Sequence, residues 1–184
     1  MTGEDTPFYI WNPLAAKRIS KILPNVKLIT LFRNPVDRAY SNYYLGIRAG
    51  SENLSFEDAI QVELTSLKNP EIASENNLEK YTNPRSYIAK GFYADQLKIW
   101  LKLFQHEQLF ITSTEDFESK PQKTLDDIYD FLQIPKNLVI NLEKYKVSSY
   151  PKMKSETREF LVDFYKIHNA KLFNMIGRKF DWDK

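Results

Sequence analysis

The chain has 184 residues, no cysteine and a formal net charge of +2. Its hydrophobic share of 42% and charged share of 27% are ordinary for a soluble globular protein, and its length predicts one domain over residues 1–184. The lack of cysteine excludes disulfides and thiolate metal sites, and two histidines make an imidazole metal site unexpected. The balanced charge and the absence of a long apolar run or leader pattern predict a cytoplasmic protein without a nucleic-acid or membrane partner.

Apolar periodicity and capping residues predict a helix-rich α/β chain. Asn12 and Pro13 begin a helix that runs to about Leu23. Residues 27–32 follow as a strand, in which Ile29 and Leu31 are expected to be buried. Asn34 then caps a helix that carries one apolar stripe, formed by Val36, Tyr40, Tyr43, Tyr44 and Ile47.

The later elements follow from the same signals. Ser55 caps a helix, and residues 68–85 are polar without a period, which predicts a long loop. The remaining predicted elements are a helix from Gly91 to about Phe104, a second buried strand at 109–112 parallel to the first, and helices over 121–132 and about 155–176.

The chemistry-bearing residues of the first half stand where the first strand meets its helix. Arg33 ends the strand, and Ser41 shares a helix face with Asn34 and Asp37. A helix N-terminus at the carboxyl end of a strand offers free N–H groups to an anion, and an Arg fork suits phosphate. The alternative interpretation makes Arg33 a surface ion-pair partner and Ser41 a tolerated helical serine.

The string RNPVDRAYSNY resembles the 3′-phosphate-binding motif of sulfotransferases that use 3′-phosphoadenosine 5′-phosphosulfate (PAPS), especially bacterial and heparan-sulfate-type members. In that family the Arg and the Ser eight residues later hold the nucleotide 3′-phosphate, so the resemblance assigns this role to Arg33 and Ser41. The segment GFYADQLKIWLKLF and the C-terminal helix are also similar to family segments. The resemblance implies PAPS, or its product adenosine 3′,5′-bisphosphate, as the nucleotide and implies no metal.

Further site residues are implied by the same resemblance. The opening GEDTPFY is similar to a family segment whose Glu is the catalytic base, which corresponds to Glu4. A carboxylate can take the proton of a hydroxyl or amine as that group attacks sulfur. An exposed carboxylate in a frayed terminus is the alternative for Glu4. The basic stretch KYKVSSYP resembles a loop that closes over the nucleotide, which would place Ser149 and Tyr150 near it.

One family element has no counterpart in the sequence. Family members have a strand, phosphosulfate-binding loop and helix before the region found here, and that loop carries a Lys that steadies the transferring group. The five glycines never cluster, and no GxxxxGK[ST] string is present. Losing a single oxyanion-type donor typically costs about 100- to 1000-fold in rate.

The implied fold is therefore a three-layer, P-loop-like sulfotransferase fold that is N-terminally incomplete, with a small parallel sheet. Three explanations stay open: a truncated product, a half that pairs with another chain, or a remnant without catalysis. An open sheet edge would favour a complementing chain or self-association.

We expect sulfuryl transfer from PAPS to a hydroxyl or amine acceptor of unspecified identity, with the isolated chain inactive or nearly so. The alternative is a non-catalytic helical interaction module that keeps the fold without its chemistry. A nucleoside kinase is disfavoured because the sequence has neither a Walker lysine nor a Mg²⁺ carboxylate pattern.

Overall fold

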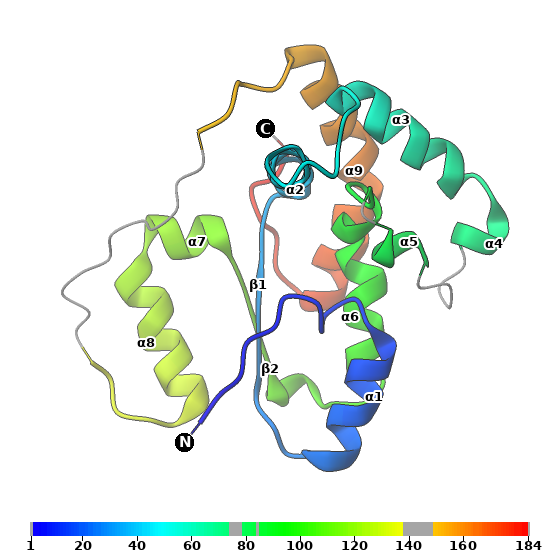
Figure 1. Cartoon of the computed structure of the whole chain (residues 1–184). Helices are drawn as coiled ribbons and strands as arrows, with labels where there is room; N and C mark the ends of the chain where they lie inside the picture. Colours follow the sequence, from blue (N-terminus) through cyan, green and yellow to red (C-terminus); the bar gives the residue numbers. More distant parts are fainter. Residues whose placement is uncertain (1, 74–78, 84, 138–148, 184) are drawn as a thin grey trace.

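Two parallel strands lie between two layers of helices in this computed structural model (Figure 1). The structure describes residues 2–73, 79–83, 85–137 and 149–183. In chain order its elements are α1 (Pro13–Ile22), β1 (Leu28–Phe32), α2 (Pro35–Arg48), α3 (Phe56–Leu67), α4 (Pro70–Ala73), α5 (Glu79–Thr82), a 3₁₀ turn η1 (Ala89–Gly91), α6 (Tyr93–Leu101), a 3₁₀ turn η2 (His106–Gln108), β2 (Leu109–Ser113), α7 (Thr114–Ser119), α8 (Pro121–Leu132) and α9 (Ser155–Ile176).

The sheet pairs β1 with β2 in parallel, with Leu28 opposite Leu109 and Phe32 opposite Ser113. Helices α1, α6 and α9 cover one face, where Phe32 belongs to a buried apolar cluster with residues of α6 and α9. Helix α8 lies on the other face, where Phe110 contacts Phe131 with ring centroids 5.5 Å apart. The predicted α/β layering with a small parallel sheet is thereby confirmed. Within the described part of the chain, no helix is long and apolar enough to cross a membrane.

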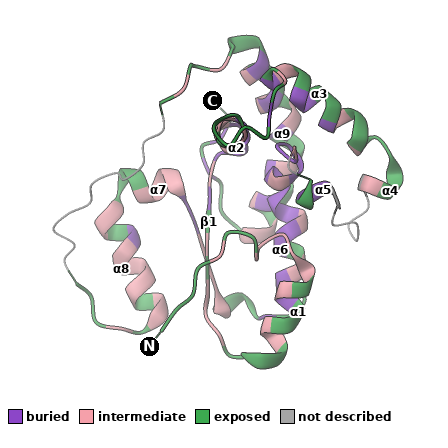
Figure 2. Ribbon diagram, viewed as in Figure 1, coloured by how far each residue is buried: buried purple, intermediate pink, exposed green. Residues whose placement is uncertain are grey.

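The predicted burial of Ile29 and Leu31 is wrong. The two residues are 44% and 50% exposed, although they lie on the sheet face that carries α8. Figure 2 shows that buried residues are concentrated in α6 and the helices around it and are few in α8. Helix α8 packs on the β2 side of that face, through Phe110, and leaves the β1 side uncovered. In the described residues β1 also pairs with β2 alone, so its other edge has no neighbouring strand.

Residues 68–85 are not the uninterrupted loop that was predicted. The Asn69 side chain accepts a hydrogen bond from the Glu71 N–H group at 2.9 Å and so caps the short helix α4. A second short helix, α5, carries the buried Tyr81 into the core beneath α3. Residues 74–78 and 84 of the predicted loop lie outside the described residues. The polar composition of this segment therefore did not predict its two short helices. Helix α4 depends on the Asn69 cap, and α5 depends on the burial of Tyr81.

Candidate anion site at the carboxyl end of β1

Arg33 and Ser41 flank the junction between β1 and α2. Arg33 follows the last residue of β1, and α2 begins two residues later at Pro35. The Asn34 side chain caps the helix by accepting the Val36 N–H group at 2.9 Å, as its sequence position predicts. Ser41 lies six residues beyond Pro35, roughly 9 Å along the helix axis. Figure 1 shows α2 almost end-on, directly beyond the carboxyl end of β1.

Two N–H groups at the start of α2 are already used, contrary to the expectation that they are free for an anion. The Asn34 N–H group donates to Oε1 of Glu115 at 2.8 Å, and Val36 donates to the Asn34 side chain. Pro35 has no N–H group. The other oxygen of Glu115 accepts the indole N–H group of Trp182 at 3.1 Å. Of the first backbone donors of α2 this leaves the Asp37 N–H group for a phosphate, so side chains would have to supply most of the contacts.

The side chains of Arg33 and Ser41 are available for that purpose. Both residues are half-buried, and neither side chain makes a hydrogen bond or ion pair with the residues that the structure describes. The backbone of Arg33 is nevertheless fixed, because its carbonyl oxygen accepts the Tyr93 hydroxyl at 2.9 Å. A guanidinium and a hydroxyl without internal partners, on a fixed backbone, suit an anionic ligand.

The segment that contains Ser149 and Tyr150 lies beside the same helix. The Tyr150 ring stacks on Tyr44 of α2, with centroids 4.8 Å apart and planes 5° apart. It also meets Tyr40 edge-on at 5.5 Å. These contacts place Tyr150 against the tyrosines of α2, and the position of Ser149 and Tyr150 beside a nucleotide stays a prediction. The predicted basic residues at 144–148 lie outside the described residues.

Glu4 is not brought into contact with this junction. Its carboxylate oxygen Oε1 accepts hydrogen bonds from the Thr6 hydroxyl at 2.8 Å and from the Tyr9 hydroxyl at 3.1 Å. Both partners belong to its own segment, and the carboxylate is exposed. The structure therefore shows an ordered turn around Glu4, and its assignment as a base stays a prediction.

Two residues that sequence reasoning did not place in the site support it. Tyr93 reaches the Arg33 carbonyl from α6, where its ring also stacks on Phe32 with centroids 4.4 Å apart. Glu115 reaches the Asn34 N–H group from α7. Glu115 stands two residues after β2, and no local pattern shows its bond to a residue 81 positions earlier in the chain. Helix α7 itself is capped by Ser113, whose side chain accepts the Asp116 N–H group at 3.0 Å.

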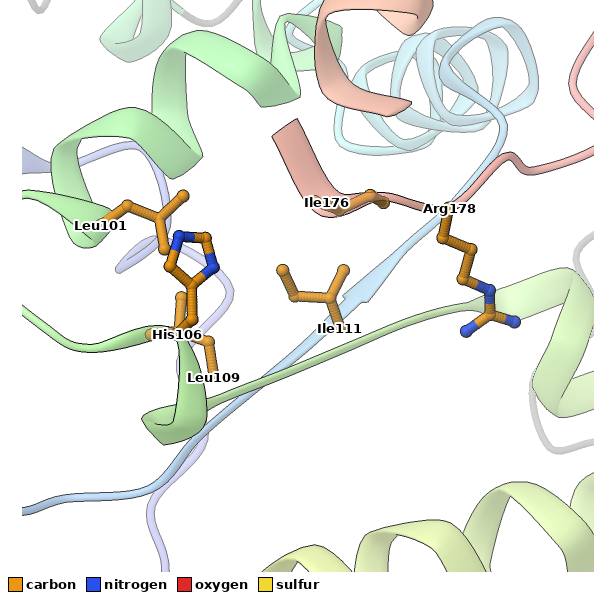
Figure 3. Close-up of a pocket in the computed structure, with 6 residues that line it drawn as sticks. All are labelled: Leu101, His106, Leu109, Ile111, Ile176 and Arg178. Atoms are coloured by element: carbon orange, nitrogen blue, oxygen red, sulfur yellow. The ribbon is translucent and has the colours of Figure 1, made fainter. Parts of the chain in front are cut away.

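Two hollows in the surface lie away from this junction. A cavity of about 260 Å³ is lined by apolar residues of α6, β2 and α9 together with His106 and Arg178 (Figure 3). The Arg178 guanidinium points away from the other lining residues and pairs with Asp116 at 2.6 Å. A hollow of about 570 Å³ lies between α3, α5, α6 and α9. Arg33 and Ser41 line neither hollow, and among the described residues no cluster of histidines and carboxylates could hold a metal.

A parallel sheet with helices on both faces defines an α/β protein, and comparison with known families shows which kind. Residues 11–184 match the Sulfotransferase domain family, to which the chain therefore belongs. A crystal structure of a sulfotransferase from Alicyclobacillus acidocaldarius superposes with a TM-score of 0.78 and 29% identity, over 96% of this chain and 65% of that one.

Two relatives of known name extend the comparison. The membrane-associated sulfotransferase kil1 of Dictyostelium discoideum is 27% identical over 99% of this chain and 53% of its own length. The bifunctional heparan sulfate N-deacetylase/N-sulfotransferase 2 of Homo sapiens is 25% identical over 95% of this chain and 22% of its own length. This chain thus spans about half or less of the length of these two relatives, and 65% of the bacterial structure.

Proposed function

We propose that the chain binds the adenosine 3′,5′-bisphosphate part of PAPS and serves in sulfuryl transfer to a hydroxyl or amine acceptor. The observation that carries the proposal is a pair of half-buried side chains, Arg33 and Ser41, at the β1–α2 junction of a sulfotransferase-family fold, neither of which has a polar partner among the described residues. The nucleotide, when bound, supplies the sulfuryl group. Arg33 would make a charged contact with the 3′-phosphate, and the Ser41 hydroxyl would donate to it.

The other predicted site residues take supporting parts in this proposal. Ser149 and Tyr150 would flank the nucleotide, which is supported by the stack of Tyr150 on Tyr44. Glu4 would take the proton of the acceptor, an assignment supported by its resemblance to the family position alone. The acceptor class is left open by these residues.

The 5′-phosphosulfate end of the nucleotide would need hydrogen-bond donors other than Arg33 and Ser41, which are assigned to the 3′-phosphate. We propose that an element carrying a phosphate-binding loop pairs with the open edge of β1, contributed by the same or another chain. The exposed side chains of Ile29 and Leu31 support this position, because a strand with its helix would cover both. The greater length of the relatives is consistent with such an element.

Calorimetric titration with adenosine 3′,5′-bisphosphate tests the nucleotide proposal. We expect the parent chain to bind it, and Arg33→Ala to weaken binding by about 10- to 100-fold, because a charged hydrogen bond contributes roughly 1.5–3 kcal/mol. Arg48→Ala is the matched control, since Arg48 is an exposed arginine at the far end of the same helix. Equal binding by the parent and the Arg33→Ala variant would contradict the proposal.

A further inference from the structure

The side of α2 that carries Ser41 also carries a carboxylate. Asn34, Asp37 and Ser41 are spaced three and four residues apart, so they lie on one side of the helix. Asp37 is half-buried and stands one turn before Ser41. An anion that contacts both Arg33 and Ser41 lies beside this side of the helix, where the Asp37 N–H group is also left as a donor. The candidate phosphate site therefore has a negative charge beside it.

A carboxylate at this position is unfavourable for binding a phosphate. Like charges repel, and the repulsion is stronger between partly buried groups because the effective dielectric constant there is lower than in water. A phosphate monoester carries about −1.5 to −2 charge at neutral pH, which increases the effect. Asp37 does favour the helix itself, since a negative charge in the first turn interacts well with the positive end of the helix dipole. Its charge thus stabilises α2 and opposes the ligand, unless a cation compensates it.

Arg158 of α9 supplies such a cation. Its Nη1 atom donates to Oδ1 of Asp37 at 2.7 Å, which joins positions 121 residues apart. The two side chains are 36% and 37% exposed, so the pair lies at the surface, within reach of a ligand. The Arg158 guanidinium makes no other hydrogen bond or ion pair with the part of the chain that the structure describes. Its charge is therefore used on Asp37 alone.

The packing of α9 fixes the position of Arg158. The preceding residue, Thr157, is buried, and its hydroxyl donates to Oε1 of Glu57 at 2.8 Å. Lys154 pairs with Oε2 of the same carboxylate at 3.2 Å. Helices α2 and α9 also contact each other and share a buried apolar cluster (Figure 1). The Arg158 guanidinium is thus held beside Asp37 by contacts that do not depend on the ion pair.

We propose that Arg158 is a positioning residue of the 3′-phosphate site, which compensates the charge of Asp37 and so allows Arg33 and Ser41 to bind a phosphate. It acts through Asp37 and is assigned no contact with the nucleotide. The inference rests on the proposed function, because it concerns the same site. It adds that recognition of the 3′-phosphate depends on α9 as well as on the β1–α2 junction.

A purely structural ion pair would behave differently. An ion pair between half-exposed groups contributes little to folding stability, so Arg158→Ala should fold. If the pair only joined α9 to α2, its loss would affect every ligand of the site alike. Compensation of Asp37 instead predicts a loss that is specific to the 3′-phosphate.

Calorimetric titrations with adenosine 3′,5′-bisphosphate and with adenosine 5′-phosphate test this difference. Arg158→Ala should bind the bisphosphate about tenfold more weakly, because the carboxylate is left uncompensated. Adenosine 5′-phosphate, which lacks the 3′-phosphate, should bind the parent and this variant equally. Arg158→Lys keeps the charge and should retain the bisphosphate affinity. Lys166→Ala is the matched control, since it removes a cation of α9 that pairs with the exposed Asp163 at 2.9 Å, and it should change neither affinity.

The double variant Asp37→Asn/Arg158→Ala shows whether Arg158 acts through Asp37. A neutral amide needs no compensating cation, so the double variant should bind the bisphosphate within about threefold of the parent. A double variant as weak as Arg158→Ala would overturn the role of Arg158. So would an Arg158→Ala variant that binds the bisphosphate like the parent, or one that loses affinity for both nucleotides equally. A parent chain that does not bind the bisphosphate would instead overturn the proposed function, and this inference with it.

Discussion

The Tyr93 hydroxyl donates a hydrogen bond of 2.9 Å to the main-chain carbonyl oxygen of Arg33. The bond joins α6 to the end of β1 and sets the direction in which the Arg33 side chain leaves the sheet. Burial raises the pKa of the Tyr93 hydroxyl to about 12, so the group stays a neutral donor at physiological pH. The candidate phosphate site thus depends on a helix 60 residues further along the chain.

Replacing Tyr93 by Phe tests this support. The ring contacts with Phe32 and Trp182 would remain, and the hydrogen bond alone would be lost. We expect the free energy of unfolding in urea to fall by about 1 kcal/mol, because the Arg33 carbonyl loses its partner. Nucleotide affinity should fall with it. Tyr129→Phe is the control, since its hydroxyl makes no hydrogen bond to the described residues. Equal effects of the two substitutions would contradict the role given to Tyr93.

The stack between Tyr150 and Tyr44 gives a second prediction. Tyr150→Ala removes the stacked ring, whereas Tyr150→Phe keeps it. Aromatic pairs contribute about 0.5–1.5 kcal/mol beyond burial, so the alanine variant should bind adenosine 3′,5′-bisphosphate about 2- to 10-fold more weakly. The phenylalanine variant should bind like the parent in the same calorimetric titration. If alanine leaves affinity unchanged, Tyr150 does not position the segment beside the nucleotide.

Glu63 gives the third prediction, which concerns pH. Burial raises the pKa of its carboxyl to about 7, against the opposing effect of the Ala89 and Ile88 N–H groups. Because the folded state holds this proton more tightly than the unfolded state does, the protonated carboxyl stabilises the fold. This stabilisation is complete below pH 4.5, the ordinary pKa, and is lost as the pH rises toward 7.

The corresponding experiment is thermal unfolding of Glu63→Gln from pH 4 to pH 8. The glutamine cannot titrate, so the part of the stability loss that falls between about pH 4.5 and 7 should vanish. Its amide group would also face one of the two N–H donors, which should cost about 1–3 kcal/mol. A variant with the parent's pH profile would show that another group titrates in this range.

The stability that Glu52 contributes should depend on pH with the opposite sign. Burial alone would raise the pKa of its carboxyl, but hydrogen bonds from Arg85, from the Leu54 and Asn53 N–H groups and from Tyr87 outweigh it and lower the pKa to about 2. Its stabilisation is therefore present above pH 4.5 and is lost as the pH falls toward 2.

Acid unfolding of Glu52→Gln tests this sign. The variant should be less stable than the parent at pH 7, and the difference should shrink as the pH falls from about 4.5 toward 2. Glu107→Gln, at an exposed carboxylate, should leave the curve unchanged. A Glu52→Gln variant whose destabilisation stays constant over this range would contradict the lowered pKa.

Local signals in the sequence predicted most of the helices and both strands. Asn12, Asn34 and Ser55 all cap the helices expected of them, because an N-cap acts within its own three residues. Burial of Ile29 and Leu31 could not be predicted in this way. An alternating or apolar strand shows which side chains share a face, but burial depends on which element covers that face, and α8 covers β2 instead.

The candidate site shows the same division. Arg33 and Ser41 can be proposed from the sequence because they stand in one short string of residues. Tyr93 and Glu115 cannot, because their bonds to residues 33 and 34 cross 60 and 81 positions of the chain. Arg158 is missed for the same reason, since its ion pair with Asp37 joins positions 121 residues apart.

Recognition of the nucleotide 3′-phosphate by Arg33 is the central claim, and a comparison of two ligands tests it most directly. Adenosine 3′,5′-bisphosphate and adenosine 5′-phosphate differ in that phosphate alone, so the ratio of their affinities isolates its contribution. We predict that the parent chain prefers the bisphosphate by about 10- to 100-fold and that Arg33→Ala loses most of this preference, because Ser41 alone is then left to hold the 3′-phosphate. An equal preference in parent and variant, or no preference in the parent, would contradict the assignment.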